Sequence, residues 1–153
     1  MPHFVVVEDD HMQREPLEGR LRETFPGARV DALVSESEFR AALPELRRQV
    51  PDLVVMDVMV RWEIPRQGMS EPPPDVLAGG YFRAGLRCAQ LLHDDPALRP
   101  VPVILYTILE LSDLERDRQV LPANTSYLGK NTDIEALLRL VRQRLRDRGR
   151  LRR

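Results

Sequence analysis

The sequence predicts an α/β protein with a doubly wound, five-stranded parallel sheet. Three short apolar runs, at residues 4–7, 53–56 and 103–106, do not alternate with polar residues, which is typical of strands buried on both faces. Between these runs lie segments whose apolar residues recur at helical spacing. Alternation of strand and helix favours an open sheet with helices on both faces, whose ligands bind at the carboxyl ends of the strands.

The order of the elements follows from these patterns. Strands are expected at residues 4–7, 28–34, 53–56, 103–106 and 126–128, with the second and last the weaker signals. Four expected helices carry these apolar stripes: Leu17, Leu21 and Phe25; Phe39, Leu43 and Leu46; Leu86, Ala89 and Leu92; Ile134, Leu137, Leu138, Val141 and Leu145. A further helix around residues 110–117 gives five strands and five helices, and residues 132–135 have the form of a capping box.

One segment interrupts this regular order. Residues 60–84, called the long connection below, contain Pro65, three consecutive prolines at 72–74 and the pair Gly79 and Gly80, without clear periodicity. The segment therefore reads as a long loop. Compact domains rarely carry an unstructured connection of more than about 15 residues unless it is functional or disordered.

Length and composition indicate one ordinary globular domain covering residues 1–153. Apolar residues make up 42% of the chain and the net charge is −1, so no overall charge draws it to nucleic acid or membrane. The single cysteine, Cys88, excludes an internal disulfide, and the N-terminus has no signal-peptide pattern. No apolar stretch approaches the length of a membrane span. We expect a soluble, cytoplasmic protein without a membrane partner.

Polar residues of chemical interest stand where the predicted strands end. They are Glu8, Asp9 and Asp10 after the first strand, Asp57 after the third, Thr107 after the fourth and Lys130 after the fifth. Because parallel strands end at one edge of a sheet, these side chains should converge there.

Carboxylates that converge repel one another and raise each other's pKa unless a cation lies among them. Mg²⁺ prefers carboxylate oxygens and keeps several waters, which leaves room for phosphate oxygens. A lysine and a hydroxyl nearby would hold those oxygens, so the set suits phosphoryl transfer. The plainer alternative is a group of solvated loop acids with a structural lysine. His3, His11 and His93 lack ligand spacing and are interpreted as solvated surface residues.

This ordered set resembles the receiver domains of two-component response regulators, in particular single-domain receivers of the chemotaxis type. That family has an acidic pair after the first strand, an aspartate after the third, Thr or Ser after the fourth and Lys after the fifth. The resemblance covers nearly the whole chain. It implies the flavodoxin-like fold with strand order 2-1-3-4-5.

The resemblance also implies roles for individual residues. Asp57 would be the phosphoacceptor and a ligand of Mg²⁺, Asp9 a direct ligand, Glu8 a ligand through water, and the Met59 backbone carbonyl a further ligand.

Three more positions follow from the same resemblance. Thr107 would bond the phosphoryl group, Lys130 would pair with it, and Tyr127 would be the aromatic switch that turns inward on phosphorylation. For Tyr127, a packed aromatic of an edge strand is an alternative.

The sequence departs from the family around the acceptor. The connection after Asp57 is considerably longer than in the family, and Arg61 replaces the usual proline. Such a loop could cover the acceptor or offer Trp62, Tyr81 and Phe82 to a partner; a tolerated, floppy insertion is the alternative.

Further departures affect the expected kinetics. Ile108 follows Thr107 in place of a small residue, and Asn131 follows Lys130 in place of a proline. Met59 and Leu109 are apolar where the family tunes the access of water, so we expect slow hydrolysis of the acyl phosphate.

Residues 139–153 hold eight arginines and one aspartate. A basic patch of this kind can contact nucleic acid or an acidic protein, but a solvated helix end, favoured by the helix dipole, is the preferred interpretation. A third option is a homodimer through the fourth and fifth helices, because Glu110, Asp113, Glu115 and Asp117 offer complementary charge.

The sequence thus predicts a switch that takes a phosphoryl group on Asp57 from a histidine kinase or phosphotransfer protein and signals through a downstream protein partner. Such a domain catalyses its own phosphorylation and dephosphorylation, yet it is primarily a switch. The alternative is a phosphorylation-independent pseudo-receiver that acts as an interaction module. A hydrolase working through an aspartyl-phosphate would want a second aspartate at position 59, where Met59 stands.

Overall fold

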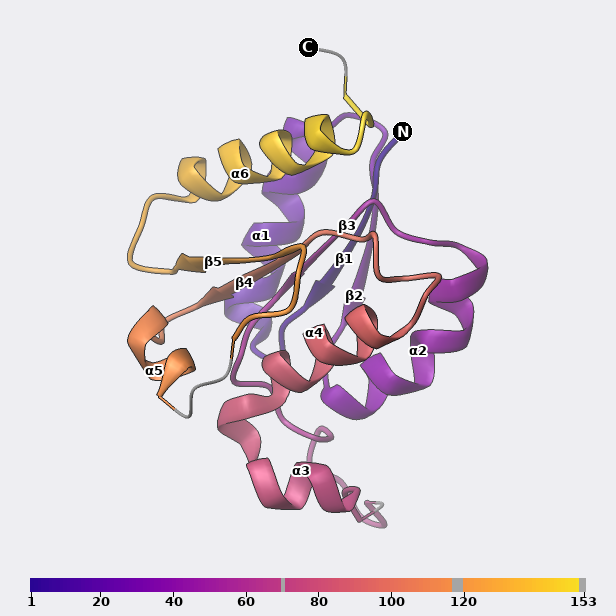
Figure 1. The fold of residues 1–153 in the computed structure, drawn as a ribbon, viewed down its shortest axis with the longest axis vertical. Coiled ribbons are helices and arrows are strands. Elements are labelled where there is room, and N and C mark those ends of the chain that lie inside the picture. The colour runs from indigo at the N-terminus through magenta and orange to yellow at the C-terminus, as the bar shows by residue number, and fades with distance from the viewer. Residues whose placement is uncertain (70, 117–119, 152–153) are drawn as a thin grey trace.

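A computed structural model describes residues 1–69, 71–116 and 120–151 of the chain. Five parallel strands form one sheet in the order β2-β1-β3-β4-β5, which confirms the predicted fold class and strand order (Figure 1). The strands are β1 (His3–Val7), β2 (Arg29–Leu33), β3 (Leu53–Met56), β4 (Val103–Thr107) and β5 (Thr125–Gly129).

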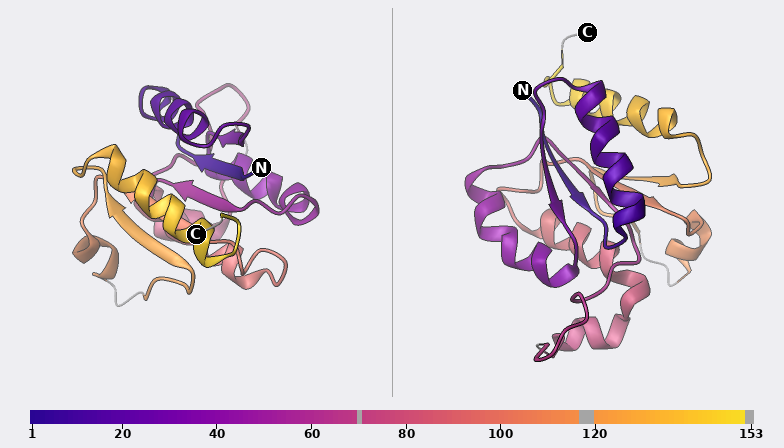
Figure 2. Two further views of the ribbon diagram at one scale, coloured as in Figure 1. Left: turned by 90° about the horizontal axis from the view of Figure 1, so that it is seen from above. Right: turned by 180° about the vertical axis from the view of Figure 1, so that it is seen from behind.

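Helices cover both faces of this sheet. They are α1 (His11–Thr24), α2 (Glu36–Arg48), α3 (Pro74–Gly79), α4 (Ala84–Asp94), α5 (Leu111–Glu115) and α6 (Ile134–Asp147), with a 3-10 turn η1 (Tyr81–Arg83). Helices α1 and α6 lie on one face, and α2 and α4 lie on the other (Figure 2). The described ranges thus contain six α-helices where five were expected. The additional one, α3, lies within the long connection.

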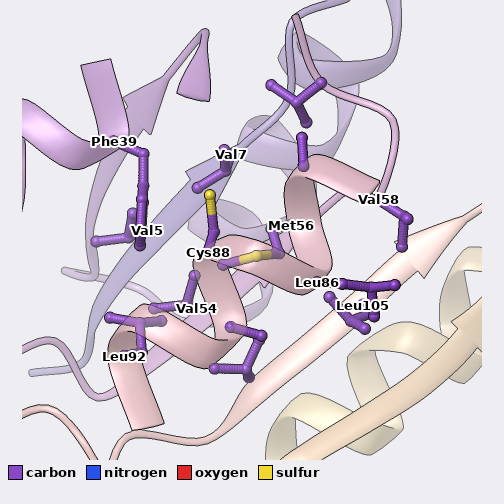
Figure 3. Packing of buried hydrophobic residues seen from close by; sticks show 14 of the residues in the cluster. Val5, Val7, Phe39, Val54, Met56, Val58, Leu86, Cys88, Leu92 and Leu105 are labelled. Atoms are coloured by element: carbon purple, nitrogen blue, oxygen red, sulfur yellow. The ribbon is translucent and has the colours of Figure 1, made fainter. Parts of the chain in front are cut away.

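Alternate residues of the central strands feed two separate cores. In β1, Phe4 and Val6 pack against α1 and α6, whereas Val5 and Val7 pack against α2 and α4. Figure 3 shows the second core, where Cys88 of α4 lies among the strand residues. Burial raises the pKa of the Cys88 thiol, which keeps it protonated and unreactive.

The long connection is tied down by a buried group of charges. Glu36 of α2 is fully buried. Its carboxylate accepts hydrogen bonds from the guanidinium of Arg87 in α4, at 2.6 and 3.0 Å, and from that of Arg40, at 2.9 Å. Arg40 also pairs with Asp75 of α3 at 2.7 Å, and Arg87 donates to the carbonyl of Gly80 at 2.8 Å. These bonds fasten α3 and the turn after it to α2 and α4. The connection is therefore partly ordered, not a loop throughout.

The beginning of the long connection meets the N-terminus of α2. The backbone N–H groups of Glu36 and Ser37 each donate at 2.8 Å, to the carbonyls of Arg61 and Trp62. A helix N-terminus has N–H groups without partners inside the helix, so this connection supplies acceptors that α2 itself lacks. The guanidinium of Arg40 lies 5.8 Å from the centre of the Trp62 ring.

Two local predictions were wrong. Helix α6 begins one residue later than a capping box at 132–135 requires: Asp133 is the N-cap and accepts the N–H of Glu135 at 3.1 Å, while Thr132 donates to the carbonyl of Gly129. His3 is not a solvated surface residue, since its side chain is 14% exposed and lies 2.7 Å from Asp31.

Gly85 allows α4 to approach the end of β3. Its N–H donates to the carbonyl of Val58 at 2.9 Å, and a Cβ at this position would lie 2.3 Å from the carbonyl oxygen of Asp57. The second obstacle is Cα of Val58 at 2.7 Å, and both atoms belong to the backbone and cannot rotate away. The missing side chain thus sets how closely α4 packs behind Asp57.

We predict that Gly85→Ala lowers the free energy of unfolding by about 2 kcal/mol, because the added methyl forces backbone to shift. Gly19→Ala in α1 is the matched control: nothing lies within 4 Å of its Cβ position, so helix propensity alone should raise stability by up to about 1 kcal/mol. Urea unfolding measures both variants. Equal stability of Gly85→Ala and the natural protein would contradict the close packing.

Candidate functional site

The parallel register brings the ends of β1, β3, β4 and β5 to one edge of the sheet. Val7 is opposite Met56, and Thr107 is opposite Gly129. The next residues along β1, β3 and β5 are therefore Glu8, Asp57 and Lys130, which leave the sheet at the same edge, with β4 between β3 and β5.

Lys130 joins the two acids that flank it. Its Nζ lies 2.9 Å from Oδ2 of Asp57 and 2.8 Å from Oε2 of Glu8. All three side chains are largely buried, with 12%, 7% and 6% exposed for Lys130, Asp57 and Glu8. Gln13 of α1 also accepts a hydrogen bond from this ammonium.

Backbone donors orient the second oxygen of Asp57. Its Oδ1 accepts the N–H of Val58 at 2.7 Å and that of Met59 at 3.3 Å. Because Oδ2 faces Lys130 and Oδ1 faces the chain that follows β3, the carboxylate is held in one orientation.

Burial and charge set the protonation of this group. Burial, with a smaller contribution from the charge of Asp57, raises the pKa of Glu8 to about 7, although the hydrogen bond from Lys130 opposes this shift. Burial by itself lowers the pKa of Lys130, but the bonds and charges of Glu8 and Asp57 outweigh it and leave that pKa above its ordinary value. Lys130 therefore stays positive and compensates the two acids.

Asp9 and Asp10 behave differently from each other. Asp9 lines the site, and its Oδ2 accepts the N–H of Arg61 at 3.0 Å. Asp10 is the N-cap of α1, accepting from Met12 at 2.9 Å, and the hydrogen bond from Gln13 lowers its pKa first of all. Asp10 thus caps α1, so of these two aspartates Asp9 is the one without a capping role.

The acids open into a hollow at the edge of the sheet. Its walls are formed by Glu8, Asp9, Asp10, His11, Gln13, Asp57, Met59, Arg61, Tyr81 and Ile108. His11 and Gln13 were not predicted as wall residues, although the first turn of a helix that follows β1 must face the strand ends. Arg61, Tyr81 and Ile108 were connected with the acceptor only through the resemblance, by the long connection and the departure after Thr107.

Thr107 and Tyr127 are both linked to Leu109. Thr107 is fully buried, and its hydroxyl accepts the N–H of Leu109 at 3.3 Å. The Tyr127 hydroxyl donates to the carbonyl of Leu109 at 2.7 Å. The tyrosine is thus directed at the loop after β4. Leu109 itself packs on the core under α2 and α4 and lines a separate hollow with Phe82.

The donor chemistry fits a hard divalent cation. Within the described residues, no three acidic, histidine or cysteine side chains are already arranged to hold one metal ion. The Lys130 ammonium lies between Glu8 and Asp57, and the Arg61 guanidinium lies 3.7 Å from the Asp9 carboxylate. Positive side chains of the protein therefore compensate the acids. Mg²⁺ needs only one or two carboxylates beside its waters, and the carboxylates that line this hollow can supply them.

The C-terminal arginines make contacts within the chain. Arg144 donates to the Ser126 hydroxyl at 2.9 Å, Arg148 donates to the carbonyl of Asp52 at 3.0 Å, and Arg150 pairs with the Asp52 carboxylate at 3.1 Å. These contacts favour a helix end that docks on its own domain over a free basic patch. Arg152 and Arg153 lie outside the described residues, as does Asp117 of the proposed dimer surface.

None of the helices in the described ranges combines the length and the apolar character that crossing a bilayer requires.

Of three comparisons with known proteins, the one with solved structures gives matches. No protein-family model matches the sequence, and no curated protein is similar to it. Solved structures do match. The signal receiver domain of a signal transduction histidine kinase from Syntrophus aciditrophicus is 25% identical, with a TM-score of 0.69 over 99% of this chain and 96% of that one.

Two further structures have the same fold. A chemotaxis response regulator of Vibrio cholerae has a TM-score of 0.65 at 16% identity, covering 95% of this chain and 99% of that one. The receiver domain of a sensor histidine kinase from Pseudomonas aeruginosa PAO1, with a magnesium ion coordinated in its active-site cleft, has a TM-score of 0.62 at 19% identity, covering 93% and 95%. The sheet order, the helical layers and these matches together make this chain a single receiver-like domain with the fold of response-regulator receivers.

Proposed function

We propose that Asp57 accepts a phosphoryl group from a histidine kinase or a phosphotransfer protein in a reaction that requires Mg²⁺. The observation that carries this proposal is the position of Lys130, whose ammonium contacts both Asp57 and Glu8 although these residues are far apart in the sequence. A lysine beside a buried, oriented carboxylate at the ends of parallel strands suits charge neutralisation in phosphoryl transfer.

In this reaction an Asp57 carboxylate oxygen forms a bond to phosphorus, while the bond from phosphorus to the donor's imidazole nitrogen breaks and its electron pair leaves with that nitrogen. Lys130 then exchanges its contact with the carboxylate for one with a phosphoryl oxygen, and the Thr107 hydroxyl donates to another.

Glu8, Asp9, Asp57 and the Met59 carbonyl would hold the Mg²⁺ ion. When bound, this ion neutralises charge that develops on the phosphoryl oxygens. These residues already line the hollow, so no other segment has to supply the oxygen ligands.

The signal then passes through protein contacts. Thr107 and Tyr127 share Leu109 as partner, so a hydroxyl of Thr107 drawn towards a phosphoryl group disturbs the loop that Tyr127 holds. The changed surface includes α5 and β5. This surface would bind a downstream protein. Alternatively, it would bind a second copy of the chain, in which the acidic residues of α5 (Asp113, Glu115 and the N-cap Glu110) would face the arginines of the partner's α6.

A phosphorylation-independent interaction module is the second candidate. The observation that favours it is the crowded mouth of the site, where Arg61 holds Asp9 and the 68% exposed Ile108 stands beside the hollow. In that case the acids would serve only to hold the strand ends together with Lys130.

We predict that acetyl phosphate with Mg²⁺ adds one phosphoryl group to the natural protein and none to Asp57→Asn, because the amide is not a nucleophile towards phosphorus. Intact-mass spectrometry measures the addition. Asp94→Asn at the end of α4 is the matched control and should be labelled like the natural protein.

Labelling of Asp57→Asn to the same extent would move the acceptor elsewhere. Absence of labelling in the natural protein, together with no change in its NMR spectrum on adding Mg²⁺ and beryllofluoride, would favour the interaction module.

We also predict a long-lived phosphorylated state. Met59 lines the hollow, and its side chain offers an attacking water only a weakly accepting thioether sulfur. Met59→Asn should speed loss of phosphate roughly tenfold, since one hydrogen bond of about 1.4 kcal/mol to the attacking water changes a rate by that factor.

A phosphate-release time course on the phosphorylated protein measures this rate. Met69→Asn, an exposed methionine of the long connection, is the control that should leave the rate unchanged. Rapid release from the natural protein, equal to that of Met59→Asn, would contradict the role of Met59.

A further inference from the structure

Of the three acids proposed to hold Mg²⁺, Glu8 and Asp57 contact Lys130 in the described structure, whereas Asp9 is bonded to Arg61. The carboxylate Oδ2 of Asp9 accepts the backbone N–H of Arg61 at 3.0 Å, and the guanidinium Nε lies 3.7 Å from the same oxygen. The Asp9 side chain is only 10% exposed, whereas the Arg61 side chain that covers it is largely in solvent.

The position of Arg61 is fixed from behind. Its carbonyl accepts the N–H of Glu36 at 2.8 Å, and Glu36 is itself fully buried and held by Arg87 and Arg40. The peptide groups around residue 61 are therefore anchored to the N-terminus of α2, which keeps the N–H directed at Asp9. Only a residue other than proline can donate this bond.

The geometry points to Arg61 as a positioning residue that acts on Asp9 in two opposed ways: the N–H orients the carboxylate for a divalent cation, and the guanidinium competes with that cation for the carboxylate. This inference rests on the proposed function, because it concerns the Mg²⁺ ion that the reaction requires. Through Arg61, the long connection would set the Mg²⁺ concentration at which Asp57 can be phosphorylated.

The size of the competition follows from exposure. A positive charge a few ångströms from a carboxylate repels a dication at the same place, but the Arg61 side chain is 57% exposed and water screens it. A change of roughly three- to tenfold in the Mg²⁺ dissociation constant is the effect expected of such a partly screened charge. The largely exposed Arg61 side chain could turn to solvent when a cation takes its place beside Asp9.

The experiment is a calorimetric titration of the full chain with Mg²⁺. Arg61→Gln keeps the N–H and removes the charge, and should bind Mg²⁺ roughly three- to tenfold more tightly than the natural protein. Arg66→Gln removes one arginine charge from the same long connection, where Arg66 lies 3.6 Å from Glu63, and should leave the affinity unchanged. Arg61→Lys should also leave it nearly unchanged.

A further variant separates the two actions of the residue. Arg61→Pro removes the charge and the N–H together, and should bind Mg²⁺ more weakly than Arg61→Gln, because Asp9 loses the donor that orients it. Thermal unfolding is a second readout that does not need phosphorylation. In the presence of a chelator, Arg61→Gln should melt at a lower temperature than Arg66→Gln, because Asp9 has lost its cationic partner. Saturating Mg²⁺ should raise the melting temperature of Arg61→Gln by more than that of Arg66→Gln.

The outcomes distinguish this inference from the proposed function. If the natural protein binds Mg²⁺ and is labelled on Asp57, while Arg61→Gln and Arg66→Gln have the same affinity, the inference fails and the proposed function stands. If neither the natural protein nor Arg61→Gln binds Mg²⁺, both fail. Tighter binding by Arg61→Gln alone supports the inference.

Discussion

The contact of Lys130 with Asp57 and Glu8 is the interaction on which the site depends. Two carboxylates from neighbouring strands are brought together in a largely buried place, where each would make the other's ionisation costly. One ammonium shared between them offsets part of that cost, although the pKa of Glu8 remains raised, and it ties β5 to β1 and β3. Loss of such a buried partner leaves uncompensated charge. Both the stability of this sheet edge and the proposed chemistry therefore depend on Lys130.

A second constraint comes from behind the strand ends. The missing side chain of Gly85 lets α4 reach the backbone of Asp57, and the buried Glu36 with Arg87 and Arg40 fastens α2 to α4 and to the long connection. The acids of the site are therefore supported by packed backbone on the side of α2 and α4. On the solvent side, the long connection contributes Arg61 and Tyr81 to the walls of the hollow.

The layout of the sheet could be predicted because the buried strands form uninterrupted apolar runs, and the convergence of Glu8, Asp57 and Lys130 follows from parallel strands ending at one edge. Helix α3 was missed because it has six residues, begins at a proline and includes a glycine, which masks any period. The capping box was misplaced because Asp133 competes with Thr132 as N-cap. Arg87 meets Glu36 51 positions away, a spacing that no local pattern encodes.

The attachment of the long connection also provides an internal optical probe. Trp62 is the only tryptophan of the chain; its carbonyl is bonded to the first turn of α2 and its ring lies beside Arg40. Indole emission depends on the polarity and charges around the ring. A loosening of residues 60–84 from α2 would thus change the wavelength and intensity of indole emission, and no label is needed to follow it.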